Sequence, residues 1–286
     1  MGGETLAALH ARARKTLRGS GAATPDLDAR FLVEWATGTT RLDALSAPER
    51  IIPDEAAGIL DGAIERRLAG EPVHRIMGER SFYGLGFRLS RETLEPRPDT
   101  EALVDLVLPF VTQRIKENGI ADAIDLGTGT GAIAIALLSR LEKLRAIGVD
   151  IAQGALDTAW ENARMAGVSR RFATLKSDWC AVVTGKFDLI VSNPPYIPRH
   201  VIATLDREVR EHDPLVALDG GEDGLDFYRA LASDSGSHLY GRGAVGVEIG
   251  AGQLAEVKSI FAERGFHLAE VAQDLGGHDR ALLFRL

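Results

Sequence analysis

The stretch Ile124-Asp125-Leu126-Gly127-Thr128-Gly129-Thr130-Gly131 ends a short apolar run and leads directly into AIAIALLSRL, residues 132–141. Glycines lack a Cβ atom, so they tolerate positive φ and let a ligand approach the backbone closely. The N-terminus of the helix that follows offers unpaired N–H groups. We therefore predict a strand–turn–helix unit that binds an adenosine-containing cofactor at Gly127, Thr128, Gly129, Thr130 and Gly131.

Apolar runs and helix-forming segments alternate from this unit to the C-terminus. Strands are expected at residues 123–126, 145–149, 172–176, 187–192, 243–249, 266–272 and 281–286. Continuous apolar strands alternating with helices indicate a mostly parallel sheet covered on both faces. The final two strands are joined by QDLGGHD, which is too short for a helical crossover, so the last strand should be antiparallel. The fold class is therefore α/β.

The N-terminal part of the chain reads as short helices separated by glycine and proline breakers. Helices are expected at residues 6–17, 26–38 and 54–69. We predict a small helical domain over residues 1–75, a β-hairpin connector over residues 76–95 and the α/β domain over residues 96–286. Thr100 or Asp99 is expected to cap the helix that opens the last domain.

The composition is that of an average globular protein, with 286 residues, 45% hydrophobic and 26% charged. The net charge of −8 divides into −1 for residues 1–75 and −7 for residues 76–286, so neither part is a basic module that binds nucleic acid tightly. No apolar run is long enough to span a membrane, and the amphipathic start is unlike a secretory signal. We expect a cytoplasmic monomer with no stable nucleic-acid partner and no membrane association.

Cysteine usage argues against a metal centre. The single Cys180 rules out an internal disulfide and a multi-cysteine metal site. We expect Cys180 in the core or in a pocket wall, and we expect no metal.

A carboxylate follows the glycine loop at a distance typical of nucleotide sites. Asp150 ends the second strand, 19 residues after Gly131. That position suits an acceptor for ribose hydroxyls. The loop does not choose the cofactor, because Gly127, Gly129 and Ala132 also fit the G-x-G-x-x-A pattern of dinucleotide-binding folds. On these residues NAD and S-adenosylmethionine compete, and a tight turn without a ligand is a third interpretation.

The motif Ser192-Asn193-Pro194-Pro195-Tyr196-Ile197-Pro198 follows the fourth strand. Adjacent prolines cannot continue a central strand, so the chain must leave the sheet here with fixed φ angles. Ligands bind at the carboxyl ends of strands in open α/β sheets. We therefore expect a rigid loop at the site, although a turn with a buried Tyr196 would also fit the motif taken alone.

This loop suits methyl transfer to a planar amide or an exocyclic amine. The nitrogen lone pair of such a group is delocalised, so its N–H bonds must be oriented before the nitrogen can attack. The Asn193 side-chain oxygen and the Pro194 carbonyl are acceptors for these two hydrogens, and Tyr196 offers a flat packing face. We predict Asn193, Pro194 and Tyr196 as catalytic residues of a direct in-line displacement.

Several blocks of the chain resemble, in the same order, the HemK/PrmC family of protein-(glutamine-N5) methyltransferases. They are GEPVHRIMGERSFYGLGF, EPRPDTEALVD, DLGTGTGAIAIAL, GVDIAQGALDTAWENA, SDW, FDLIVSNPPYI, DGGEDGLDFYR, EIGAGQ and QDLGGHDRALLF. The resemblance implies a helical N-terminal domain that helps recognise the substrate and a Rossmann-like class I methyltransferase domain. It also implies S-adenosylmethionine as cofactor, S-adenosylhomocysteine as product, and the glutamine of the Gly-Gly-Gln motif of peptide chain release factors as substrate.

The resemblance also implies roles for individual residues. The loop from Gly127 to Gly131 should bind the methionine part of the cofactor, and Asp150 should bind its ribose. Asp178 and Trp179 should lie near the adenine. Asn193 should touch both cofactor and substrate, and the glutamine amide should be held by Asn193, Pro194, Pro195 and Tyr196.

Three more residues lie in family blocks and have two interpretations each. Phe82, Arg97 and Glu248 either line the site or act as hairpin core, salt-bridge partner and strand-end cap, respectively. Two departures from the family pattern stand out: Glu95 replaces an aliphatic residue before Pro-Arg-Pro, and His212-Asp213-Pro214 replaces an aromatic-Glu-Pro element. Neither departure is expected to touch the chemical core.

Three other functions compete with glutamine methylation. One is methylation of adenine N6 or cytosine N4 in nucleic acid, which the acidic chain without a basic insert disfavours. A non-catalytic binding protein is disfavoured by the intact Asn193 and glycine loop. A nicotinamide oxidoreductase is disfavoured because no acid/base pair for hydride transfer is evident.

Overall fold

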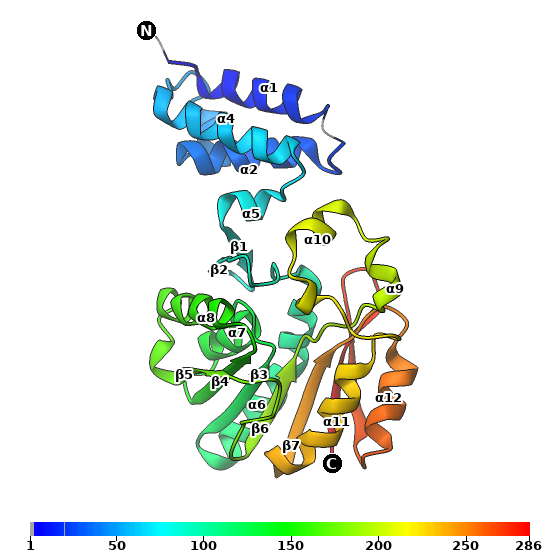
Figure 1. Cartoon of the computed structure of the whole chain (residues 1–286). Coiled ribbons are helices and arrows are strands. Elements are labelled where there is room, and N and C mark those ends of the chain that lie inside the picture. The colour runs from blue at the N-terminus through cyan, green and yellow to red at the C-terminus, as the bar shows by residue number, and fades with distance from the viewer. Residues whose placement is uncertain (1–2, 20) are drawn as a thin grey trace. The chain divides into compact units, whose positions relative to one another are not determined.

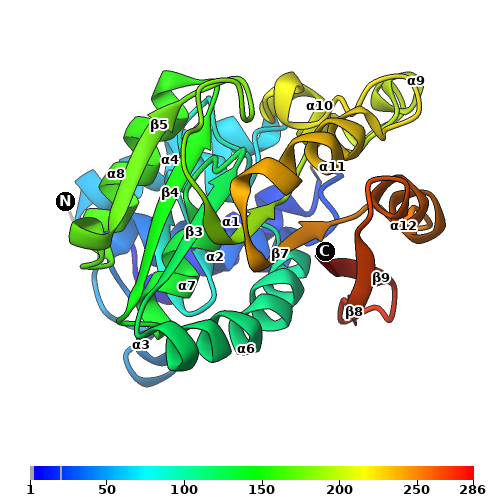
Figure 2. The same cartoon turned by 90° about the horizontal axis from the view of Figure 1, so that it is seen from below.

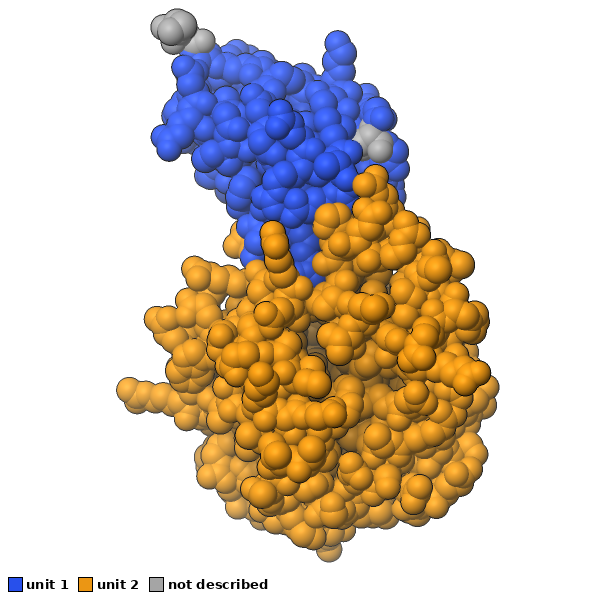
Figure 3. Space-filling view, viewed as in Figure 1, with its two compact units in different colours: residues 1–78 blue, residues 79–286 orange. Residues whose placement is uncertain are grey.

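The computed structural model describes residues 3–19 and 21–286. The chain divides into two compact units, Met1–Gly78 and Glu79–Leu286, which Figure 3 shows in different colours. In the described part of the chain, no helix combines the length and the apolar character needed to cross a bilayer.

The first unit is a helical bundle made of α1 (Leu6–Leu17), α2 (Pro25–Thr37), α3 (Arg41–Ser46), α4 (Asp54–Leu68) and α5 (Val73–Met77). Leu9, Leu32 and Leu60 come from α1, α2 and α4 and are fully buried in one apolar core. A buried ion pair between Arg67 and Asp28, 2.7 Å long, joins α4 to α2. The three predicted helices are present, with α3 and α5 as unpredicted short additions.

The second unit begins with the predicted hairpin, β1 (Glu79–Phe82) and β2 (Leu85–Arg88). Tyr83 and Gly84 form its two-residue turn at φ 52° and 78°, the backbone that tight hairpin turns require. Phe82 and Phe87 are both buried and their rings meet edge to face. Phe82 is therefore hairpin core.

A seven-stranded sheet forms the centre of the second unit (Figure 1). The strand order is β5 (Phe172–Lys176), β4 (Leu144–Asp150), β3 (Ala121–Leu126), β6 (Phe187–Ser192), β7 (Leu239–Glu248), β9 (Asp279–Arg285) and β8 (His267–Gln273). The first five strands in this order run parallel, and β9 is antiparallel to both neighbours. This confirms the predicted sheet with its antiparallel last strand, and it brings the carboxyl ends of β3, β4 and β6 to one edge.

Helices cover both faces of the sheet, and alternate strand residues face each layer. One layer holds α6 (Glu101–Asn118), α7 (Ala132–Arg140) and α8 (Gln153–Met165), which share a core with Ala123 and Val191. The other holds α11 (Asp226–His238) and α12 (Leu254–Ala262), packed on Ile124 and Ile190. Figure 2 shows β5 and α8 at one end of the sheet and β8, β9 and α12 at the other.

Five short elements complete the second unit. A 3₁₀ turn, η1 (Pro98–Thr100), precedes α6, and η2 (Ser169–Arg171) precedes β5. The long segment after β6 contains α9 (Arg199–Ile202), α10 (Arg207–His212) and η3 (Leu215–Ala217). None of these was predicted.

Thr100 occupies the N-cap position of α6, as predicted, but its side chain makes no capping hydrogen bond because its backbone belongs to η1. The Thr100 hydroxyl instead accepts a hydrogen bond from Asn193 at 3.1 Å. Strand β7 was predicted to begin at residue 243 but begins at Leu239. Gly241 and Gly243 interrupt the apolar pattern without ending the strand.

Candidate active site

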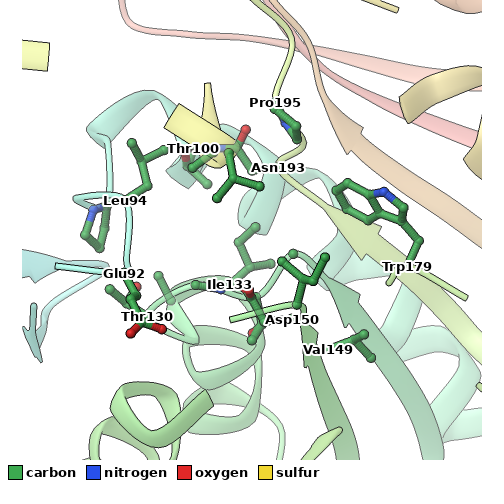
Figure 4. Close-up of a pocket in the computed structure, with 18 of the residues that line it drawn as sticks. Glu92, Leu94, Thr100, Thr130, Ile133, Val149, Asp150, Trp179, Asn193 and Pro195 are labelled. Carbon is green, nitrogen blue, oxygen red and sulfur yellow. Dashed lines mark hydrogen bonds between the residues drawn. The ribbon is translucent and has the colours of Figure 1, made fainter. Parts of the chain in front are cut away.

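A cavity opens where β3, β4 and β6 end (Figure 4). Its walls come from the loops that follow these strands and β5, from the start of α7, from the segment before α6 and from η3. The predicted residues that line it are Gly127, Thr128, Gly129, Thr130, Asp150, Asp178, Trp179, Asn193 and Pro195. Gly131, Pro194 and Tyr196 lie outside the lining. The cavity therefore collects residues from 127 to 195 that the sequence had assigned to one site.

The glycine loop adopts the backbone that glycine permits. Gly127, Gly129 and Gly131 have φ of 69°, 53° and 80°. A Cβ at Gly131 would lie 2.7 Å from the Ile135 Cδ1 atom, so this glycine lets the start of α7 pack closely. No atom would lie within 4 Å of a Cβ at Gly129, which leaves open space beside this residue at the cavity.

Asp150 is fixed at the tip of β4 by two backbone donors. Its Oδ2 accepts from the Gly129 N–H at 2.9 Å, and its Oδ1 accepts from the Ala152 N–H at 3.0 Å. A carboxylate has about four acceptor sites, so each oxygen keeps one for a further donor. Asp150 thus holds the glycine loop and still faces the cavity with free acceptor capacity.

A second carboxylate lies beneath the same loop, and sequence reasoning gave it no role. Asp125 is 1% exposed, and its Oδ2 accepts from the Thr128 hydroxyl at 2.8 Å. Burial, with a smaller contribution from the Asp150 charge, raises the pKa of Asp125 to about 7. The sequence did contain a signal for Asp125, because it lies within the apolar strand that leads into the glycine loop. Burial of a carboxylate is costly, so one in a buried strand suggests a specific role.

An aromatic wall closes one end of the cavity. Trp179 has a positive φ of 48°, which is uncommon for a residue with a side chain, and its ring lies 3.9 Å from that of Phe227. Asp178 and Ser177 line the cavity beside it. Cys180 is half-buried against the neighbouring core, and burial raises the pKa of its thiol to about 11. Cys180 therefore packs on the core rather than in the cavity lining, and its thiol is protonated at neutral pH.

All charged side chains in the described cavity lining are acidic. Glu92, Glu95, Asp150 and Asp178 contribute carboxylates, and none of the described lining residues is Lys, Arg or His. Within residues 3–19 and 21–286, no group of three or more His, Cys, Asp or Glu side chains could hold a metal ion. The cavity offers acceptors, an aromatic face and glycine backbone.

The Asn193 side chain lies in the lining, opposite the glycine loop. Its Nδ2 donates to the Thr100 hydroxyl at 3.1 Å, and Figure 4 shows the two side chains together. With one end of the amide tied to Thr100, the oxygen is the group left to meet a ligand. Thr100 was predicted only as a helix cap. Its contact with Asn193 could not be predicted, because the two residues are 93 positions apart in the sequence.

Tyr196 lies outside the cavity lining, and its side chain bonds a buried carboxyl group. Its hydroxyl donates to the Glu248 Oε1 at 3.3 Å, and its carbonyl accepts from the Gln253 Nε2 at 3.1 Å. Glu248 ends β7 and is 1% exposed, and burial raises its pKa to about 7. The structure thus places Glu248 behind the loop that carries Asn193, outside the cavity lining.

Comparison with known proteins decides the family. The PrmC N-terminal domain matches residues 8–78, and the methyltransferase small domain matches residues 101–208. The chain is 49% identical to a release factor glutamine methyltransferase of Agrobacterium fabrum, over 99% of this chain and 98% of that protein. It is 43% identical to the protein of the same name from Rhodospirillum rubrum, over 94% of this chain and 81% of that protein. The chain belongs to the release factor glutamine methyltransferase family.

A solved structure agrees with the fold. The catalytic domain of hMettl16, in complex with the MAT2A 3'UTR hairpin 6, superposes with a TM-score of 0.56 and 17% identity. The match covers 78% of this chain and 81% of that one. At this identity the likeness concerns the fold, a class I methyltransferase sheet.

Within this release factor glutamine methyltransferase fold, one predicted departure does reach the site. Glu95 was expected to stay clear of the chemical core, but it lines the cavity and accepts from Arg80 at 2.6 Å. The ion pair supplies the partner that a buried carboxylate needs, so the aliphatic position is filled by a charged pair. The expectation for Glu95 was wrong because the segment before α6 lines the same cavity as the glycine loop.

The second departure forms an ion pair at the edge of the site. Arg97 donates to the Asp213 carboxylate at 2.6 Å, and the Asp213 side chain is 4% exposed. Neither residue lines the cavity. Arg97 is therefore a salt-bridge partner that joins the segment before α6 to the end of α10.

Proposed function

We propose that this protein transfers a methyl group from S-adenosylmethionine to the side-chain nitrogen N5 of the glutamine in the Gly-Gly-Gln motif of peptide chain release factors. The observation that carries the proposal is the Asn193 amide, which faces the cavity while its Nδ2 is taken up by Thr100. Membership of the release factor glutamine methyltransferase family supports the substrate.

The acidic lining favours a cationic cofactor. S-adenosylmethionine carries a sulfonium and an ammonium, whereas NAD carries a pyrophosphate that would meet four carboxylates and no described basic residue. In this proposal Asp150 accepts from the ribose hydroxyls, Trp179 packs on the adenine with Asp178 beside it, and the methionine part lies along Gly127 to Gly131. When bound, the cofactor supplies an activated methyl group and leaves as S-adenosylhomocysteine.

The loop after β6 is proposed to hold the glutamine amide. The Asn193 Oδ1 and the Pro194 carbonyl accept the two N–H hydrogens, which aims the nitrogen lone pair toward the cofactor side of the cavity. Pro195 packs against the flat amide, and Tyr196 supports this loop from outside the cavity lining through its hydrogen bond to Glu248. Leu94, Ile133 and Pro195 add apolar surface that keeps water from the nitrogen. The proton leaves the nitrogen after the new bond has formed.

The remaining expectations belong to the same proposal. The helical unit over residues 1–78 helps to recognise the release factor, and the chain acts as a monomer. A translation factor as substrate places the reaction in the cytoplasm. Light scattering after size exclusion measures the oligomeric state directly.

The test is methyl transfer with purified components. The protein is incubated with labelled S-adenosylmethionine and, in separate reactions, a release factor, the same factor with its Gly-Gly-Gln glutamine changed to alanine, duplex DNA and ribosomal RNA. We expect a 14 Da increment on one peptide of the unaltered factor only. Label in DNA or RNA without label in the factor would replace the proposal with nucleic-acid amino-methylation.

A further inference from the structure

The Asn193 amide has two ends of almost the same shape and opposite hydrogen-bonding character. The oxygen accepts, and the NH2 group donates. Rotation by 180° exchanges them without a change in packing. If Asn193 is to accept a hydrogen from a substrate amide, something in the protein must keep its oxygen toward the cavity. The neighbours of the amide therefore decide whether the site works.

Thr100 is the neighbour that distinguishes the two ends. Its hydroxyl oxygen accepts from the Asn193 Nδ2 at 3.1 Å, and Thr100 is 4% exposed and lines the cavity. A helix-capping role does not explain this threonine, because no side chain caps α6. The Thr100 hydroxyl thus contacts Asn193 and does not cap its own helix.

A threonine hydroxyl can also donate, so a further group must keep its proton away from Asn193. The Thr100 hydroxyl also interacts with the Glu248 carboxyl and favours its charged form, lowering a pKa that burial raises, and the Glu248 Oε2 atom is buried with no other hydrogen-bond partner among the described residues. An ionised carboxylate is an acceptor only. When Glu248 is ionised, the Thr100 hydroxyl is therefore expected to donate toward it, which leaves the Thr100 oxygen lone pairs for the NH2 end of Asn193.

Other groups around Glu248 support the same arrangement. The Tyr196 hydroxyl donates to its Oε1 at 3.3 Å, and the Arg280 charge favours its ionised form. The charge of Asp99 raises the pKa of Glu248 and so favours its neutral form. Arg280 is held by Asp274 at 2.9 Å, so the charge beside Glu248 has a fixed place.

We infer that Thr100 and Glu248 are positioning residues that orient the Asn193 amide, with its oxygen toward the substrate nitrogen. Glu248 accepts a hydrogen bond from the Thr100 hydroxyl, and the Thr100 oxygen accepts one from the Asn193 NH2 group. The Asn193 oxygen then remains free to accept from the substrate. The inference rests on the proposed function for its kinetic consequence. The orientation itself is a property of the protein without substrate.

The kinetic test compares Thr100→Val, which keeps the shape and removes the hydroxyl, with Thr100→Ser, which restores it. Loss of one orienting hydrogen bond should lower kcat on the release factor by roughly tenfold or more in Thr100→Val, with the S-adenosylhomocysteine Kd unchanged. Thr100→Ser should recover most of kcat. The control is Thr112→Val on α6. The Thr112 hydroxyl donates to the Leu108 carbonyl within the helix, so this change should leave kcat unchanged.

A double-mutant cycle separates orientation from general damage. In an Asn193→Ala background there is no amide to orient, so Thr100→Val should have little further effect on kcat. Equal losses in the two backgrounds would overturn the inference. Glu248→Gln tests the other end of the chain of hydrogen bonds: it should lower kcat in the wild-type background and not in Asn193→Ala.

A spectroscopic measurement covers the case in which the substrate assignment fails. In protein labelled with 15N-asparagine and bound to S-adenosylhomocysteine, the Asn193 side-chain NH2 is identified by its absence in Asn193→Ala. These protons should exchange slowly with water in the wild type and in Thr100→Ser, and several-fold faster in Thr100→Val. Equal exchange in Thr100→Val overturns the orientation whatever the substrate is. Methyl transfer that fails on every release factor, with slow exchange intact, overturns only the proposed function.

Discussion

Two aspartates under one loop behave differently because their surroundings differ. Asp150 is half-exposed at the tip of β4 and accepts from two backbone N–H groups. Asp125 is buried, and its Oδ1 has no hydrogen-bond partner among the described residues. Burial raises the pKa of Asp125 and so favours its protonated form. One can accept from a ligand, and the other responds to pH.

Asp150→Ala should weaken cofactor binding. The change removes a charged acceptor for the ribose hydroxyls and the anchor of the Gly129 N–H, so the affinity for S-adenosylhomocysteine should fall by about 1–3 kcal/mol. Isothermal calorimetry measures this. Asp157→Ala on the exposed side of α8 is the control and should bind as the wild type does. Equal affinities for the two variants would remove Asp150 from the cofactor site.

Asp125→Asn should flatten the dependence of stability on pH. The pKa of Asp125 is raised from 3.8 to about 7 by burial, so the folded protein keeps a proton that the unfolded chain releases. The stability from this group is full below pH 3.8 and is lost as pH rises toward 7. Urea unfolding of the cofactor-free protein at pH 5, 6, 7 and 8 should show a smaller decline for Asp125→Asn than for the wild type or Asp157→Asn. Identical declines would refute the pKa assignment.

At the scale of elements, the central strands were predictable and the contacts between distant segments were not. The run FDLIVS is buried along its whole length, so sequence alone identifies β6. The helices α9 and α10 have four and six residues and no buried side chain, so no apolar pattern marks them. The motif at Asn193 was readable as a rigid corner, but its partner Thr100 comes from a turn 93 residues earlier.

One buried amide joins the hairpin to the glycine loop. The Asn162 Oδ1 accepts from the Arg88 N–H at 2.8 Å, and its Nδ2 donates to the Thr130 carbonyl at 2.9 Å and the Arg88 carbonyl at 3.1 Å. Asn162 is 1% exposed, so water cannot replace these bonds. This side chain thus links β2, α8 and the glycine loop.

Asn162→Ala should therefore destabilise the protein by roughly 2–4 kcal/mol, since it leaves buried backbone groups unpaired. Urea unfolding gives the difference in free energy. The matched control is Asn118→Ala at the exposed end of α6, which should change stability by less than about 0.5 kcal/mol. A loss below about 1 kcal/mol for Asn162→Ala would mean that water reaches the freed groups.

At the scale of the whole molecule, chemistry and recognition are proposed to belong to different units. Every described residue that lines the cavity lies between residues 92 and 217, inside Glu79–Leu286. The helical unit has its own apolar core, and the second unit has two cores, one on each face of the sheet. Each unit thus buries apolar surface of its own, which a separately folding domain requires.

A chain of residues 79–286 should therefore keep the chemistry and lose affinity for the protein substrate. Its Kd for S-adenosylhomocysteine should equal that of the full chain, because no described lining residue is removed. Its KM for an intact release factor should rise by about tenfold or more, which corresponds to roughly 1.4 kcal/mol of lost binding, while kcat/KM for a short peptide with Gly-Gly-Gln should change little. Steady-state kinetics on both substrates measure the split. An unchanged KM for the release factor would assign recognition to the catalytic unit alone, and equal losses on both substrates would show that the helical unit supports the fold rather than the partner.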